Sequence, residues 1–132
     1  MSELNNEKPP VGSVTWFDLT VDDAKPIKDF YQAVVGWTPQ PVAMGDYEDY
    51  SMNSPETGDP MAGVCYARGS NAHLPPVWMI YVNVDDIDAS VSRCIELGGS
   101  LIGQIRTMGN LGRYCAIKDP AGAVLSLFEP TT

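Results

Sequence analysis

Apolar and polar residues alternate along two segments of the chain, residues 14–21 and 78–84. The two apolar faces are formed by Phe17, Leu19 and Val21, and by Ile80, Val82 and Val84. The opposite faces present Trp16, Asp18 and Thr20, and Met79, Tyr81 and Asn83. Such alternation predicts two β-strands, each with one covered face.

The two segments repeat one pattern. Adding 63 to the residue numbers of WFDLTVDD, 16–23, gives MIYVNVDD, 79–86, and the same offset carries Gly36 onto Gly99. A strand, an acidic pair and a glycine that recur in constant register indicate an internal duplication.

A helical periodicity follows each predicted strand. The expected apolar stripes are Ile27, Phe30, Tyr31 and Val34, and then Ile87, Val91, Cys94 and Ile95. The acidic pair before each helix is expected to cap its first turn, which also tolerates Pro26. Gly36 is placed to end the first helix in the left-handed conformation, and Gly98-Gly99 to end the second.

Short strand candidates separated by turn residues follow each helix. They cover 36–42, 47–53 and 61–67, and then 100–106, 112–118 and 123–129, with a tight turn at DPAG before the last. The pattern predicts an α+β domain over 13–131 made of two tandem βαβββ modules, 13–67 and 77–130. We expect two curved sheets around a cleft, helices on the outside, and a flexible leader at 1–12.

The charge composition of the chain limits the kinds of partner that it can bind. The 132 residues include 17 acidic and 8 basic side chains, for a formal net charge of −9. Nucleic acids and anionic membrane surfaces are therefore disfavoured, because phosphate contacts need clustered Lys and Arg. No stretch approaches the roughly 18 apolar residues of a membrane span. These features are typical of a soluble cytoplasmic protein.

The counts of cysteine and histidine limit the chemistry. Cys65, Cys94 and Cys115 are odd in number and far apart, which favours buried thiols in a reducing compartment over disulfides. The single histidine, His73, lies in the loop sequence GSNAHLPP, and we expect it to be exposed rather than catalytic. Without a CxxC or a histidine pair, the chain cannot build the usual four-ligand zinc site.

Several motifs resemble the vicinal oxygen chelate superfamily, which includes glyoxalase I, bleomycin-resistance proteins and extradiol dioxygenases. They are D-x6-FY-x4-GW from Asp23 to Trp37, the run YVNVDDIDASVSRCIELGG, and GRYCAIKDPAGAVLSLFEP. The resemblance covers about residues 13–130 and implies the duplicated fold and a homodimer. It does not single out an activity, because the superfamily contains isomerases, lyases, dioxygenases and drug-binding proteins.

The resemblance also implies where a metal would be held. Metal-dependent members carry ligands at the start of each module's first strand and near its last strand. The matching places are Trp16, Met79, Ser126, and Ala62 or Gly63. None is a usual ligand for a divalent metal ion. We therefore expect no cofactor, with a divalent metal unsupported at these positions.

The polar faces of the two predicted strands are expected to line the cleft, together with residues of the last strand. Aromatic groups with a few polar ones are typical of a small-molecule pocket. The candidate ligand-binding residues are Trp16, Thr20, Tyr50, Met79, Tyr81, Asn83, Arg113, Ser126 and Phe128. The alternative is that these side chains fill the space as core. The acidic residues of the run DYEDY, 46–50, which ends at Tyr50, are expected to mark a solvated turn.

Asp18 is the candidate catalytic residue, because a carboxylate between Phe17 and Leu19 is costly to bury without a partner. It could act as a base or anchor a cationic ligand, or it could be a structural residue that is hydrogen-bonded or ion-paired, for instance with Arg113 or Arg106. Arg113 could instead bind an acidic ligand or lie in solvent.

Three hypotheses follow. The first is a protein that binds a small, partly aromatic molecule without metal. The second is a glyoxalase-type lyase or isomerase, or a dioxygenase-related enzyme, with a relocated metal or Asp18 as base. The third is an interaction domain whose cleft is filled and whose partner is another chain.

Overall fold

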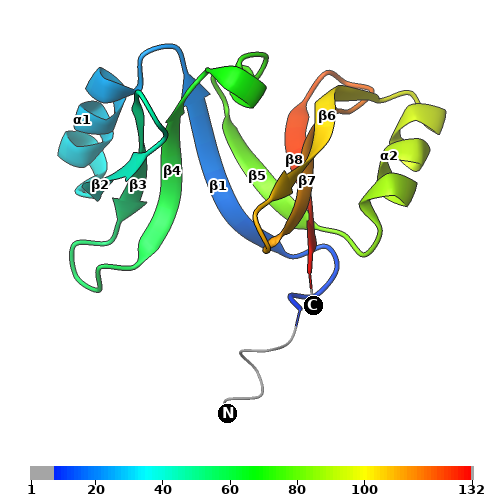
Figure 1. Cartoon of the computed structure of the whole chain (residues 1–132), viewed down its shortest axis with the longest axis horizontal. Helices are drawn as coiled ribbons and strands as arrows, with labels where there is room; N and C mark the ends of the chain where they lie inside the picture. The colour runs from blue at the N-terminus through cyan, green and yellow to red at the C-terminus, as the bar shows by residue number, and fades with distance from the viewer. Residues whose placement is uncertain (1–7, 132) are drawn as a thin grey trace. The chain divides into compact units, whose positions relative to one another are not determined.

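The computed structural model describes residues 8–131, and it confirms the predicted α+β fold of two βαβββ modules (Figure 1). Module 1 consists of β1 (Val14–Val21), α1 (Ala24–Val35), β2 (Thr38–Ala43), β3 (Glu48–Asn53) and β4 (Pro60–Tyr66). Module 2 consists of β5 (Trp78–Asn83), α2 (Ile87–Glu96), β6 (Ser100–Met108), β7 (Gly112–Lys118) and β8 (Val124–Pro130). The predicted strand ends lie within two residues of those observed.

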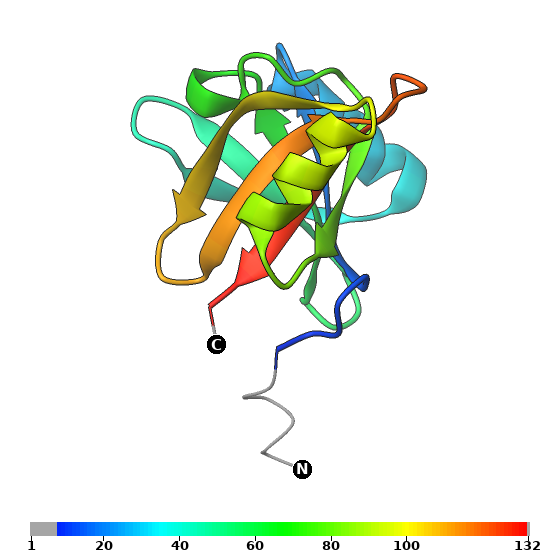
Figure 2. The same cartoon turned by 90° about the vertical axis from the view of Figure 1, so that its right-hand side faces the viewer.

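Contacts divide the chain into two compact units, one from Trp16 to Met79 and one from the described residues on either side. The strand order is β2-β3-β4-β1 in module 1 and β5-β8-β7-β6 in module 2. Each module places its helix against one face of its own sheet (Figure 1), and Figure 2 shows α2 lying across β7 and β8.

The strand register confirms the internal duplication. In module 1, β1 runs parallel to β4, with Asp18 opposite Gly63 and Thr20 opposite Cys65. Adding 63 to each number gives Tyr81 opposite Ser126 and Asn83 opposite Phe128, which are the pairs formed by β5 and β8. The two modules therefore share one register at their central strands.

The core of module 1 lies between α1 and its sheet. Ala24, Tyr50, Met52 and Val64 are buried there, and the partly buried residues packed against them are Val21, Ile27, Tyr31, Trp37, Tyr66 and Trp78. The predicted helix stripe is correct at Ile27 and Tyr31 but wrong at Phe30 and Val34, which are 54% and 64% exposed. The buried stripe runs through Ala24, so the contacting face is rotated away from these two residues.

The helix ends follow the predicted chemistry with one exception. Gly36 has φ 91° and donates its N–H to the Gln32 carbonyl, so it ends α1 as a left-handed cap. Asp86 caps α2 by accepting a hydrogen bond from the Ala89 N–H at 3.1 Å. Asp23 makes no such bond, because the matching third position of α1 is Pro26, which has no N–H.

The core of module 2 is built from Ile87 and Val91 of α2 and from Cys115 and Leu127 of the sheet. The predicted stripe of α2 is wrong at Ile95, which is exposed, while Cys94 is partly buried. The DPAG turn is confirmed, since the Asp119 carboxylate accepts from the N–H groups of Ala121 and Ala123.

The chain before β1 is attached to module 2. The Gly12 N–H donates to the Asn83 carbonyl at 2.8 Å, and the Asn83 N–H donates to the Ser13 carbonyl at 2.9 Å. The predicted leader is therefore held at its end, while its residues 1–7 lie outside the described part of the chain. Within the described residues, no helix is long and apolar enough to cross a membrane.

Candidate functional site

A hollow of ≈180 Å³ opens on the sheet of module 1. Its polar walls come from β1, β3 and β4, at positions that alternate with core residues such as Leu19 and Val64. The hollow therefore lies mainly on the sheet face that is not packed against α1. Its lining residues are Trp16, Asp18, Val42, Met44, Asp49, Tyr50, Ser51, Gly63 and Cys65.

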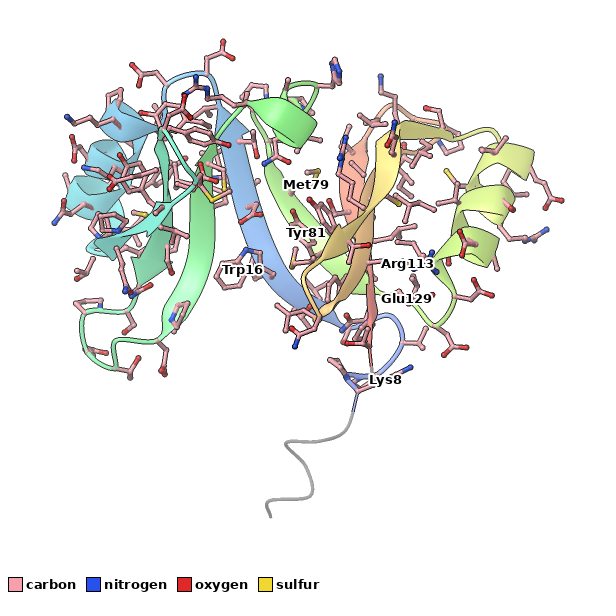
Figure 3. The ribbon with its side chains drawn as sticks, in the orientation of Figure 1. Lys8, Trp16, Met79, Tyr81, Arg113 and Glu129 are labelled. Carbon is pink, nitrogen blue, oxygen red and sulfur yellow. The ribbon has the colours of Figure 1, made fainter. Side chains whose placement is uncertain are left out.

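An indole and a carboxylate are joined on this face. Trp16 donates its Nε1–H to Asp18 Oδ1 at 2.6 Å, between side chains that share one face of β1 (Figure 3 labels Trp16). A Cβ atom at Gly63 would collide with Asp18 Oδ1 and would lie 3.6 Å from Trp16 Nε1. Glycine at position 63 thus provides the space in which the Trp16–Asp18 pair sits.

A second carboxylate of the hollow is buried. Asp49 is only 8% exposed, and its Oδ1 accepts a hydrogen bond from the Tyr66 N–H at 2.9 Å. Burial raises the pKa of Asp49, while the hydrogen bonds from Tyr66 and the Cys65 thiol act in the opposite direction. The prediction that the DYEDY run is a solvated turn is therefore wrong at Asp49.

The pKa of the Cys65 thiol depends on its burial and on the charges that line the hollow. Burial raises the pKa of Cys65 strongly, and the negative charges of Asp18 and Asp49 raise it further. Cys65 is accordingly held as a neutral thiol and is a poor nucleophile. Burial likewise raises the pKa of Cys115 to about 11.

The implied metal position of module 1 does not fit a divalent ion. The shared register matches Gly63, rather than Ala62, to Ser126 of module 2. Gly63 offers no side-chain donor, and the Trp16 indole has only an N–H to give. Among the residues that the structure describes, no group of three or more His, Cys, Asp or Glu side chains could hold a metal ion.

The module 2 candidates share one sheet face. Tyr81, Asn83, Ser126 and Phe128 face away from Leu127, which packs in the α2 core. Tyr81, Asn83 and Ser126 are buried, as is Met79. The Asn83 Nδ2 group donates to Ser13 Oγ at 2.8 Å, whereas Asn83 Oδ1 has no partner within the described residues. Ligand binding by this set stays a prediction.

The remaining candidates lie in different surroundings. Thr20 is buried on β1, and Tyr50 lies in the module 1 core while also bordering the hollow. Arg113 of β7 lies beside Glu129 of β8 (Figure 3) and forms an ion pair with it at 3.0 Å. It forms a second ion pair with Asp88 of α2 at 2.8 Å. His73 is exposed in the loop before β5, as expected.

Sequence reasoning missed part of this site. Asp49, Ser51 and Cys65 line the hollow, although none was a candidate binding residue. The signal was present in the alternation of DYSM, in which Asp49 and Ser51 oppose the buried Tyr50 and Met52.

Comparison with known proteins identifies the family. The sequence model of the Glyoxalase/Bleomycin resistance protein/Dioxygenase superfamily matches residues 13–127. The chain belongs to this superfamily. The match extends across both modules, in agreement with the duplicated fold described above.

Curated relatives of this superfamily member are about twice its length. "Putative glyoxylase CFP32" of Mycobacterium tuberculosis is 32% identical over 123 residues, which cover 89% of this chain and 46% of the relative. "Anthracycline biosynthesis protein DnrV" of Streptomyces peucetius is 31% identical over 133 residues, covering 89% and 47%. The chain thus spans about half the length of these relatives.

Solved structures support the fold of this superfamily member. Methylmalonyl-CoA epimerase from Mycobacterium tuberculosis matches with a TM-score of 0.54 at 17% identity, covering 98% of this chain and 96% of that one. A methylmalonyl-CoA epimerase in complex with methylmalonyl-CoA and NH4+ matches with a TM-score of 0.57 at 12% identity, covering 93% and 97%. At these identities the likeness concerns the fold alone.

Proposed function

We propose that this superfamily member binds a small, partly aromatic molecule without a metal ion, and that the hollow of module 1 forms part of its site. The observation that carries the proposal is the Trp16–Asp18 pair above Gly63. It places an aromatic ring and a hydrogen-bonding carboxylate where the metal-dependent pattern would need a ligand.

The negatively charged side chains that line the hollow favour a positively charged ligand. Asp18 and Asp49 both line it, and the described lining residues include no Lys, Arg or His. Because two carboxylates act on the same space, an ammonium group is favoured over a neutral or anionic one. The Trp16 ring can contact an aromatic part of the ligand or the cation itself.

The size of the hollow limits the part of a ligand that it can enclose. Its ≈180 Å³ is below the roughly 300–1,000 Å³ of pockets that bury drug-sized molecules. It therefore suits a single aromatic ring with a short charged substituent, or one such group of a larger molecule.

A matched series of three compounds tests this proposal. Benzylammonium, benzyl alcohol and benzoate differ mainly in charge, and their affinities can be measured by isothermal titration with a chelator present. We expect benzylammonium to bind best and benzoate worst. Asp18→Asn should reduce the preference for benzylammonium over benzyl alcohol by roughly tenfold, the effect of about 1.4 kcal/mol.

The control is Asp59→Asn, which removes an exposed carboxylate of module 1 outside the hollow. It carries the same change in net charge and should leave the preference unaltered. Equal binding of benzylammonium and benzyl alcohol by the unmodified protein would refute the proposal. So would an equal effect of both substitutions.

A second candidate function is catalysis of the lyase or isomerase type with Asp18 as general base. Two observations favour it: the Asp18 carboxylate lines the hollow, and a relative carries a glyoxylase name. A glyoxalase assay of the protein in the presence of a chelator distinguishes catalysis from binding alone. Turnover that Asp18→Asn abolishes would support catalysis, whereas binding without turnover would support the first proposal.

A further inference from the structure

A larger hollow of ≈560 Å³ lies elsewhere on module 1 and is not used by the proposed function. It lies at the β2–β3 hairpin and includes Lys25 from the first turn of α1. Its lining residues are Lys25, Ala43, Gly45, Asp46, Tyr47, Glu48, Tyr50 and Tyr66. Only Tyr50 also borders the smaller hollow.

The hairpin wall of this second hollow is held in shape by local contacts. The Met44 N–H donates to the Tyr47 carbonyl at 2.9 Å, and Gly45 between them has φ 93°. The Arg68 guanidinium lies 4.6 Å from the centre of the Tyr47 ring, and its Nη2 is 3.9 Å from Asp46. The wall is therefore organised before any ligand arrives.

Three tyrosines supply aromatic and hydroxyl groups. The rings of Tyr47 and Tyr66 meet edge to face, with centroids 5.8 Å apart. The Tyr66 hydroxyl reaches Asp23 Oδ1 at 3.5 Å. Burial, with smaller effects of the neighbouring Tyr66, raises the pKa of Tyr50, so this phenol stays protonated and can donate a hydrogen bond.

The charged groups of the second hollow are mixed in sign. Lys25 contributes an ammonium group, while Asp46 and Glu48 contribute carboxylates. The nearby cations do not change this balance, because Arg68 lies 3.9 Å from Asp46 and Lys28, beside Tyr50, is paired with Asp29. A neutral molecule with several hydroxyl groups suits a lining of mixed charge, because each hydroxyl can donate to a carboxylate and accept from an ammonium.

We propose that this second hollow binds a neutral, hydroxyl-rich small molecule of the size of a single sugar ring. The C–H face of the ring would pack against Tyr47, and its hydroxyl groups would bond to Lys25 and Glu48. The volume lies within the range of small-molecule pockets, and the lining combines ring faces with convergent polar groups.

The test uses the methyl pyranosides of glucose, galactose and mannose as probes. Saturation-transfer NMR on the full chain detects weak binding and identifies the ligand protons that contact the protein. We expect at least one pyranoside to bind, with its ring C–H protons receiving the strongest saturation. Tyr47→Ala should weaken this binding by up to roughly tenfold, the effect of losing an aromatic contact of about 1.4 kcal/mol.

Three further variants make the test specific. Lys25→Met replaces an exposed lysine of the hollow and should also weaken binding, while Lys118→Met, at an exposed lysine of β7, should not. Trp16→Phe alters only the smaller hollow and should leave pyranoside binding unchanged. The pyranoside test can therefore fail while the proposed binding of an aromatic ammonium in the smaller hollow holds, and the reverse. If Tyr47→Ala does not fold, the comparison of pyranoside binding by Lys25→Met and Lys118→Met tests the inference.

Three outcomes would overturn the inference. One is that no pyranoside binds. Another is that Tyr47→Ala and Lys25→Met, both folded by their amide spectra, bind as the unmodified protein does. The third is that benzoate or benzylammonium shifts the amide signals of residues 43–48 more strongly than any pyranoside, because that would assign the hollow to a charged ligand.

Discussion

Gly63 lies opposite Asp18 on neighbouring parallel strands, and the Asp18 carboxylate occupies the space that a side chain at position 63 would need. The same carboxylate is bonded to the Trp16 indole. Three residues of two strands are thus interdependent. Trp16 and Gly63, which the family resemblance matches to metal-ligand positions, both adjoin the Asp18 carboxylate.

Gly63→Ala is expected to destabilise the protein by about 1–3 kcal/mol, the usual cost of overpacking. The new methyl group would displace the Asp18 carboxylate and break its bond to Trp16. Urea unfolding measures the loss. In an Asp18→Ala background the obstructing carboxylate is gone, so Gly63→Ala should cost less there. Equal costs in both backgrounds would show that the carboxylate is not the obstacle.

Asp18→Asn is expected to make the Cys65 thiol more reactive at alkaline pH. Removing one negative charge lowers the pKa of Cys65, although burial keeps that pKa above its ordinary value. Peptide-level mass spectrometry of iodoacetamide labelling reads each cysteine separately. Cys115 serves as the internal control, because Asp18 does not contribute to its raised pKa. An unchanged labelling rate at Cys65 would argue against an effect of Asp18 on this thiol.

The fold could be predicted from the sequence because it depends on periodicity and on turn residues. The offset of 63 between Trp16–Asp23 and Met79–Asp86 reappears in the strand register. Gly36 and the DPAG turn also end their elements as expected, since each relies on a backbone conformation that few residues adopt. Such signals are local and need no knowledge of distant contacts.

The site was predicted less completely, because its residues depend on tertiary neighbours. The position of Asp18 predicts a carboxylate that needs a hydrogen-bonding or ionic partner, but the sequence does not identify the Trp16 indole, two residues away, as one of its donors. The acidic neighbours of Asp49 predict a solvated turn. The buried carboxylate of Asp49 accepts a hydrogen bond from Tyr66 of β4, a neighbour that the sequence of β3 does not specify.

The two N-cap aspartates provide a matched pair for a third prediction. Asp86→Ala should lower the free energy of unfolding by about 1 kcal/mol, because it removes the acceptor of the Ala89 N–H. Asp23→Ala should cost clearly less, since Pro26 leaves α1 without the corresponding donor. Urea unfolding of both variants checks the difference. A cost for Asp23→Ala as large as that for Asp86→Ala would contradict this account of the two helix ends.

The fourth prediction concerns acid stability and rests on Glu129. Hydrogen bonds from Arg113 and from the Ile87 N–H lower the pKa of Glu129 in the folded state. A carboxyl whose folded pKa is depressed contributes stability that is fully present above its unfolded pKa. That stability is lost as the pH falls through the folded value. Glu129→Gln should therefore lower the melting temperature at neutral pH.

The difference in melting temperature between Glu129→Gln and the unmodified protein should shrink as the pH is lowered below about 4.3, the ordinary glutamate pKa. Thermal melts at a series of pH values measure it. Glu96→Gln is the control, because Glu96 pairs with Arg93 on the exposed surface of α2, where an ion pair contributes little. A difference for Glu129→Gln that stays constant across the acid range would mean that packing, rather than the charge of Glu129, links β8 to α2.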